Sequence, residues 1–140
     1  YKVQIGDIKL YKWLTKIGLT SNKTLTLGEL KIPDKYFRDF LRGHLDGDGS
    51  IIYYKDKYNS KYIYERLFVY FISASKTHIE WLRTKILQLK NVHGSFSYHK
   101  PIYRLKFSTR EAKIILNWVY HKPDLPCLLR KYQIAKPFLI

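Results

Sequence analysis

Residues 40–52 read FLRGHLDGDGSII. A helix-like apolar run ends there in two aspartates, Asp46 and Asp48, each followed by a glycine, and a β-branched stretch comes next. The C-terminal end of a helix carries partial negative charge, so each acid at this position is misplaced by roughly 0.3–1 kcal/mol. We therefore expect a positive group to compensate for these acids.

The composition predicts a folded, basic protein. The 140 residues fit a single domain, and 46% hydrophobic and 16% aromatic residues can supply a core. A formal net charge of +15 points to a polyanionic partner, nucleic acid before an anionic membrane surface, although a basic but indifferent surface is the alternative. No run reaches transmembrane length, so we expect no membrane partner. The single Cys127 fits an intracellular, reducing compartment, either an organelle or a prokaryotic cytoplasm.

The two ends of the sequence resemble each other. YKVQIGDIKLYKWLTKIGL at 1–19 and YRLKFSTREAKIILNWVY at 103–120 both read as a strand, a capped turn and an amphipathic helix. A chance likeness between two strand–helix units is the alternative. Because the chain also contains no methionine, we expect residues 1–28 to be the strand–helix–loop tail of a preceding repeat, and residues 29–140 to form the main domain.

The pattern of turns and periodicities predicts an α+β fold. Helices are expected where apolar residues recur at helical spacing after a cap, and strands where they alternate. The expected elements are a strand at 1–5, a helix at 7–17 capped by Asp7, a helix from Pro33 to the DGDG stretch, a hairpin at 50–57 and 62–73, a helix capped by Ser75, strands at 95–100 and 102–107, a helix to Trp118 with a Ser108–Glu111 capping box, and a basic helical tail at 128–138.

Asp46-Gly47-Asp48-Gly49 also resembles the start of a calcium-binding EF-hand loop. That loop requires Gly at its sixth position and Glu at its twelfth, which here are Ile51 and Lys57. A plain Asp-Gly turn is the other alternative, but it leaves Gly43 unexplained, since glycine inside a helix costs about 1 kcal/mol relative to alanine. Close helix–helix contact would explain Gly43, and would bring a second acidic helix tip beside the first, with a divalent metal between the acids.

LRGHLDGDG at 41–49 resembles the LAGLIDADG motif of homing endonucleases. The resemblance extends over the chain: an IP lead-in before the motif, the αββαββα order, and an RKY tail at 130–132. Arg42, His44 and Gly47 depart from the name-giving residues. The resemblance implies a curved antiparallel sheet that serves as a DNA-binding saddle, with the motif helix at its edge.

The same resemblance implies roles for individual residues. Gly43, with Phe40, Leu41 and His44, would form an interface with a second motif helix. Asp48 would bind the metal together with the carbonyl of Gly47. Asp46 would act mainly in the turn at the helix end and would also be one of the metal ligands. Magnesium fits these oxygen ligands and the phosphate, and would polarise the phosphate and help to generate the nucleophile. Lys106 would assist as a basic catalytic residue or make a plain phosphate contact.

An alternating sheet can present every second side chain to the major groove. In the strand at 62–73 the even positions are mostly basic or polar-tipped, and in the last strand Arg104 and Lys106 share one face, so these side chains are expected to face the DNA. For the strand at 50–57 the sequence leaves open which alternate residues face the DNA. The family arrangement favours Ile52, Tyr54 and Asp56, whereas charge favours Lys55 and Lys57. The candidate DNA-binding residues are Tyr54, Lys55, Lys57, Tyr62, Tyr64, Arg66, Tyr70, His99, Arg104 and Lys106.

Three hypotheses follow for function. The first is a site-specific DNA endonuclease that makes metal-dependent staggered double-strand breaks at a long target. The second is a non-catalytic nucleic-acid binder on the same fold, either an RNA-splicing maturase or a transcription regulator. The third is a packing module without a function of its own. One motif supplies one metal-binding acid for two strands, so we expect self-association or pairing with a second LAGLIDADG half.

Overall fold

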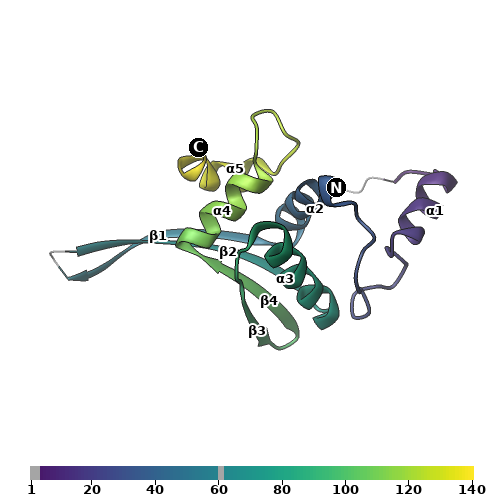
Figure 1. Cartoon of the computed structure of the whole chain (residues 1–140), viewed down its shortest axis with the longest axis horizontal. Coiled ribbons are helices and arrows are strands. Elements are labelled where there is room, and N and C mark those ends of the chain that lie inside the picture. Colours follow the sequence, from purple (N-terminus) through teal and green to yellow (C-terminus); the bar gives the residue numbers. More distant parts are fainter. Residues whose placement is uncertain (1–3, 60–61) are drawn as a thin grey trace.

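The computed structural model describes residues 4–59 and 62–140 and is an α+β fold (Figure 1). The motif helix and the two hairpins that follow have the predicted αββαββα order. The elements are α1 (Ile8–Lys16), α2 (Asp34–Gly47), β1 (Ser50–Asn59), β2 (Tyr62–Ser73), α3 (Lys76–Lys90), β3 (Ser95–His99), β4 (Ile102–Ser108), α4 (Thr109–Val119), α5 (Leu129–Ala135) and a 3-10 turn at Lys136–Phe138.

One antiparallel sheet in the order β1-β2-β4-β3 organises the domain. Alternate residues of β2 and β4, among them Val69, Phe71 and Leu105, are fully buried beneath the helices. Helix α2 adds Phe37, Leu41 and Leu45 to the same core, and α3 and α4 cover the rest of this face (Figure 1). The sheet therefore has one face covered by its own helices and a second face that no helix of the described residues covers.

The helix starts follow local chemistry at two of three predicted caps. The Asp7 carboxylate accepts hydrogen bonds from the backbone of Lys9 and Leu10, and the Ser75 hydroxyl accepts one from His78 N–H. The predicted Ser108–Glu111 capping box is wrong, because α4 begins after Ser108 without a side-chain cap. Helix α4 packs on β2 and β4.

The N-terminal part of the chain differs from the rest. The predicted strand at 1–5 lies partly outside the described residues, and at positions 4 and 5 no strand forms. Helix α1 has no buried residue and stands apart from the sheet (Figure 1). The loop after it is attached to α3, where the carbonyls of Leu27 and Gly28 face Ser75 Oγ and His78 Nδ1. The division into residues 1–28 and 29–140 stays a prediction.

Across residues 4–59 and 62–140, no helix combines the length and apolar character needed to cross a membrane.

Candidate active site and nucleic-acid interface

The motif ends α2 in a tight turn. The backbone N–H groups of Asp48 and Gly49 both donate to the carbonyl of His44, at 3.0 and 3.1 Å. A Cβ on Gly49 would come within 2.7 Å of the Tyr70 carbonyl and 2.8 Å of the Leu45 Cα. Glycine is therefore required at position 49 because helix and strand backbones meet there.

The positive group expected at this helix end is Lys131 from α5. Its Nζ donates to the carbonyls of Leu45, Asp46 and Gly49, at 2.6, 2.8 and 2.7 Å. These bonds satisfy carbonyls that a helix leaves unpaired at its C-terminal end. The side chain is buried, and this burial lowers the pKa of Lys131 below its usual value, while the nearby Asp46 and Asp48 act in the opposite direction.

Asp46 is held by its own chain. One carboxylate oxygen accepts from the Tyr120 hydroxyl at 2.9 Å, and the other accepts from the backbone N–H of Leu128 at 3.0 Å. Burial and this bond to Asp46 raise the pKa of Tyr120. The expected turn role of Asp46 agrees with this geometry, because both carboxylate oxygens help to join α2 to the C-terminal segment. Its inclusion among the metal ligands stays a prediction.

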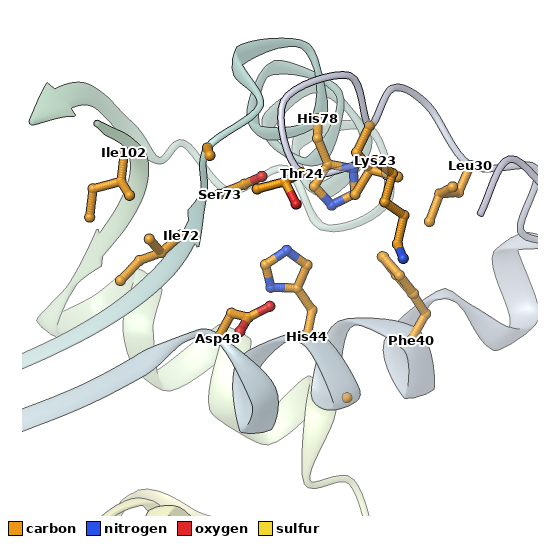
Figure 2. Close-up of a pocket in the computed structure, with 13 residues that line it drawn as sticks. Lys23, Thr24, Leu30, Phe40, His44, Asp48, Ile72, Ser73, His78 and Ile102 are labelled. Atoms are coloured by element: carbon orange, nitrogen blue, oxygen red, sulfur yellow. The ribbon is translucent and has the colours of Figure 1, made fainter. Parts of the chain in front are cut away.

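Asp48 has the opposite environment. It is exposed at the end of α2, and within the described part of the chain no ion pair or side-chain hydrogen bond engages its carboxylate. It lines a pocket of about 680 Å³ together with His44 and Gly43 of α2. Figure 2 shows the Asp48 and His44 side chains pointing from α2 into this space, across from Thr24 and His78. Asp48 is therefore free to bind a ligand.

A metal ion at this position would find only part of its ligands in this chain. The exposed Asp48 carboxylate and the Gly47 carbonyl, which Lys131 leaves free while it takes those of Asp46 and Gly49, suit a hard cation. Among residues 4–59 and 62–140, no three His, Cys, Asp or Glu side chains are grouped to hold a metal. The Asp48 carboxylate and the Gly47 carbonyl would thus supply two oxygen ligands to a divalent cation, and the remaining ligands would come from water, phosphate or a second motif.

His44 lies at the floor of the same pocket, against His78. The two imidazole rings are stacked at 5.3 Å between centroids, and the His44 ring also meets Phe40 and Phe71 edge-on. Burial, followed by the proximity of His78, lowers the pKa of His44 to about 4. Burial likewise lowers the pKa of His78. His44 is therefore a neutral packing residue near pH 7.

The predicted motif-helix interface divides into an open part and a buried part. Gly43 is exposed, and nothing lies within 4 Å of a Cβ placed on it. Phe40 and His44 are partly buried but line the open pocket. Leu41 was wrongly included, because it is fully buried in the core of this chain. A residue four positions from Leu45 on the helix shares its inward face.

Arg42, one of the departures from the motif, has a structural role. Its guanidinium donates to the carbonyls of Pro126 and Val119, both at 3.1 Å, and to the Asp39 carboxylate at 2.8 Å. These contacts join α2 to the end of α4 and the loop after it, which an alanine could not do.

The sheet register resolves which side chains share the uncovered face. Tyr54 pairs with Arg66 and Asp56 with Tyr64, and cross-strand partners point to the same side. Lys55 and Lys57 point to the other side, so the charge-based choice of these two residues was wrong. Continuing the register across β2, β4 and β3, the uncovered face carries Ile52, Tyr54, Asp56, Tyr62, Tyr64, Arg66, Tyr70, Arg104, Lys106, Ser95, Ser97 and His99.

Contacts on this face leave its cations available. Arg66 is 3.6 Å from Asp56, and both side chains are more than two-fifths exposed. Lys106 Nζ lies 4.5 Å above the Phe68 ring. Lys106 pairs with Tyr70, which in turn pairs with Ser50, two residues after Asp48. The candidate basic residue and the motif acid therefore belong to neighbouring parts of one surface, although Lys106 does not line the Asp48 pocket.

Sequence reasoning missed several residues of the site. Lys131 lies in the RKY stretch, but a single lysine in a basic tail carries no sign of its three carbonyl partners. Tyr120 pairs with Asp46 across 74 residues. Lys23, in the loop after α1, lines the pocket that contains Asp48. No local pattern places any of these residues at the motif.

The order of elements, the sheet order and the helix tip define the fold of the homing endonucleases. Two solved structures of the homing endonuclease I-CvuI share it, with TM-scores of 0.55 and 0.54 and 13% identity over 75% of this chain and 67% of theirs. One holds an I-CreI target with Mg and uncleaved DNA, the other its own target with Ca. The homing endonuclease I-TnaI matches with a TM-score of 0.52 and 15% identity, over 72% of this chain and 67% of that one. No protein-family model and no curated protein sequence matches the chain.

Proposed function

We propose that this chain is a site-specific DNA endonuclease that makes metal-dependent, staggered double-strand breaks at a long target. The observation that carries the proposal is the difference between the environments of Asp46 and Asp48 at the end of α2. The fold uses both oxygens of Asp46 but leaves the Asp48 carboxylate exposed beside a pocket. An exposed carboxylate beside a pocket, with no hydrogen-bond or ion-pair partner among the described side chains, is available to a cation.

The residues near Asp48 would divide the chemistry among them. A bound magnesium ion would polarise the scissile phosphate and promote attack by water. Asp48 and the Gly47 carbonyl would hold that ion, with the turn fixed by Gly49. Lys106 would contribute positive charge on the same surface, either at an ordered water or at a phosphate oxygen. The neutral His44 would contribute packing only, since its pKa is about 4.

The uncovered sheet face would bind the DNA duplex. A curved antiparallel sheet presents alternate side chains to base edges in the major groove. Arg66, Arg104 and Lys106 supply positive charge on this face, and tyrosines supply hydrogen-bonding tips. The net charge of +15 favours association with the phosphate backbone.

A double-strand break requires two acids, and each chain supplies one Asp48. The exposed Gly43 is where a second motif helix could approach without steric conflict. Pairing with an identical chain would place two Asp48 residues beside a two-fold axis and favour a near-palindromic target. Pairing with a different motif half would favour an asymmetric target.

A non-catalytic nucleic-acid binder, such as a maturase or transcription regulator, is the second candidate. The same basic sheet face would serve it equally well. Such a binder has no use for an exposed carboxylate at the helix tip, and this is why we prefer the endonuclease.

Selection from a randomised duplex library decides between the two. The chain is incubated with the library and magnesium, and the ends of cut molecules are sequenced, with Asp48→Asn as the matched control. We expect staggered ends at one long sequence, which disappear with Asp48→Asn. Specific retention of duplexes without cutting would instead establish the binder.

A further inference from the structure

Lys131 makes an unusual set of contacts for a lysine. An ammonium group has three protons, and here each has its own backbone carbonyl at 2.6 to 2.8 Å. Only 3% of the residue is exposed. Burial of an ammonium group is unfavourable unless it is fully paired, so Lys131 is held at one position by a complete set of acceptors.

The three acceptors lie on both sides of the motif turn. Leu45 and Asp46 belong to the last turn of α2, and Gly49 follows it immediately before β1. Gly47 and Asp48, the two proposed metal ligands, thus lie in sequence between residues whose carbonyls accept hydrogen bonds from the same ammonium group. The position of Asp48 depends on the backbone of this short segment, which has only one residue, Gly49, between the helix cap and the strand.

The surrounding contacts fix Lys131 itself. The backbone N–H of Lys131 donates to the Leu128 carbonyl at 2.9 Å, and the backbone N–H of Leu128 donates to the Asp46 carboxylate. The start of α5 is therefore attached to the motif turn through both its backbone and its lysine side chain. A neutral side chain of similar length could fill the space but could not draw in three carbonyls.

We propose that Lys131 is a positioning residue for the metal site, acting through the backbone of the motif turn to hold Asp48 and the Gly47 carbonyl in place for the cation. This inference rests on the proposed metal-binding role of Asp48. It assigns the C-terminal helix α5 a part in the chemistry, although Lys131 itself is buried against backbone carbonyls and touches no reacting group.

The test compares three variants by backbone NMR. Lys131→Met removes the charge and keeps the length, and Lys131→Arg keeps the charge but has a planar fork that cannot meet the three carbonyls in the same way. Ile86→Ala, in the buried core of α3, is the control for general loss of stability. Two quantities are measured in each: amide hydrogen exchange along α2, and the Mn²⁺ concentration that half-broadens the Asp48 and Gly49 amide signals.

With Lys131→Met we expect the Asp48 and Gly49 amides to exchange at least about a hundredfold faster relative to the Leu41 amide, because the turn opens locally. We expect the Mn²⁺ midpoint to rise about tenfold, since a disordered turn must be ordered on binding. Lys131→Arg should fall between Met and the wild type. Ile86→Ala should accelerate exchange along all of α2 and leave the Mn²⁺ midpoint unchanged.

Two results would overturn the proposal. One is exchange in Lys131→Met that rises evenly along α2, as in Ile86→Ala, and the other is an unchanged Mn²⁺ midpoint. Either would make Lys131 a stabilising residue only, and if Lys131→Met does not fold, Lys131→Arg carries the same comparison. Absence of Mn²⁺ broadening at Asp48 in the wild-type chain would overturn the metal-binding role of Asp48 itself, and with it the metal-site role given to Lys131.

Discussion

The end of α2 has a covered side and an open side, and each side carries one of the two motif aspartates. On the covered side, Asp46 is bonded to Tyr120 and Leu128, and Lys131 closes the turn beneath it. On the open side, Asp48 projects beside the pocket without a partner among the described side chains (Figure 2). The same contrast runs through the sheet, where one face is packed under helices and the other carries Arg66, Arg104 and Lys106.

Helix geometry explains how two identical residues acquire different roles. Positions two apart on an α-helix point about 200° from each other. One aspartate of the pair must therefore face the body of the protein when the other faces away from it. We expect stability to depend on Asp46, which faces the body of the protein, and the proposed chemistry to depend on Asp48, which faces away from it.

Asp48→Asn is the change with the largest expected effect. Loss of the metal-binding charge should reduce the cleavage rate by at least about a thousandfold, while target binding and the unfolding temperature stay close to wild type. Cleavage with magnesium, a binding isotherm with Ca²⁺ and thermal unfolding measure the three quantities. If DNA binding and stability fall together with cleavage, Asp48 has a structural role instead of a metal-binding one.

Asp46→Asn should show the reverse balance. The amide cannot accept from both Tyr120 and Leu128 with its two terminal atoms, so we expect a loss of about 1–3 kcal/mol in the free energy of unfolding. Cleavage at a temperature well below unfolding should fall much less than with Asp48→Asn. Urea denaturation is the measurement, with Tyr120→Phe as the control that removes only one of the two bonds. A fully stable but inactive Asp46→Asn would break the comparison.

His44, at the boundary of the two sides, should make stability depend on pH. Its pKa is about 4 in the folded chain and near 6.5 when unfolded, so between these values the unfolded state binds more protons. Stability should therefore fall as the pH falls from 6.5 to 4, by about 3 kcal/mol. The nearby His78, Asp48 and Lys131 modulate this range.

His44→Leu is the matched variant for this pH dependence. Denaturant unfolding at several pH values should give a clearly shallower slope for His44→Leu than for the wild type, with the remaining slope due in part to His78. Identical slopes would show that His44 is already protonated or solvated in the folded chain.

Removal of an arginine from the open sheet face should weaken DNA binding. Arg66→Ala or Arg104→Ala should reduce the dependence of log K on log salt by about 0.9 if a phosphate contact is lost. A base contact would instead cost about 1–3 kcal/mol in discrimination at one base pair. Lys55→Ala, on the opposite side of the hairpin, is the control and should change neither quantity. Equal effects from Lys55→Ala would contradict the assignment of the faces.

Gly43→Ala should have the smallest effect and opposite signs in two assays. A Cβ meets nothing within 4 Å in the single chain, so the free energy of unfolding should increase by about 0.8–1 kcal/mol through helix propensity. Pairing of motif helices should weaken, because the backbones can no longer approach closely. Unfolding and sedimentation measure the two effects, and unchanged or stronger association would mean that Gly43 is not an interface residue.

The sequence predicted most of the core domain because its strands and helices depend on local patterns. Alternation in 62–71 identified the buried positions Leu67, Val69 and Phe71, and Ser75 identified the start of α3. The LAGLIDADG-like stretch led to the fold that the solved homing endonucleases share. These features are determined by residues that are close together in the sequence, so a single sequence is enough to predict them.

The site was less accessible to prediction because its contacts are distant in sequence. The resemblance assigned a turn role to Asp46 and a metal role to Asp48, but the residues that hold Asp46 and the turn, namely Tyr120, Leu128 and Lys131, lie more than 70 residues away in the sequence. Leu41 was misplaced because apolar character alone does not reveal which side of a helix its own chain covers. The parity of β1 likewise depended on its register with β2.

An anomalous-scattering map of the chain bound to its target duplex with Mn²⁺ tests the central claim most directly. Manganese suits the same carboxylate and carbonyl oxygens as magnesium. We predict a peak coordinated by the Asp48 carboxylate and the Gly47 carbonyl beside a DNA phosphate, with Asp46 still bonded to Tyr120 and Leu128. A metal peak on Asp46, or a duplex bound on the open sheet face with no metal at Asp48, would contradict the account.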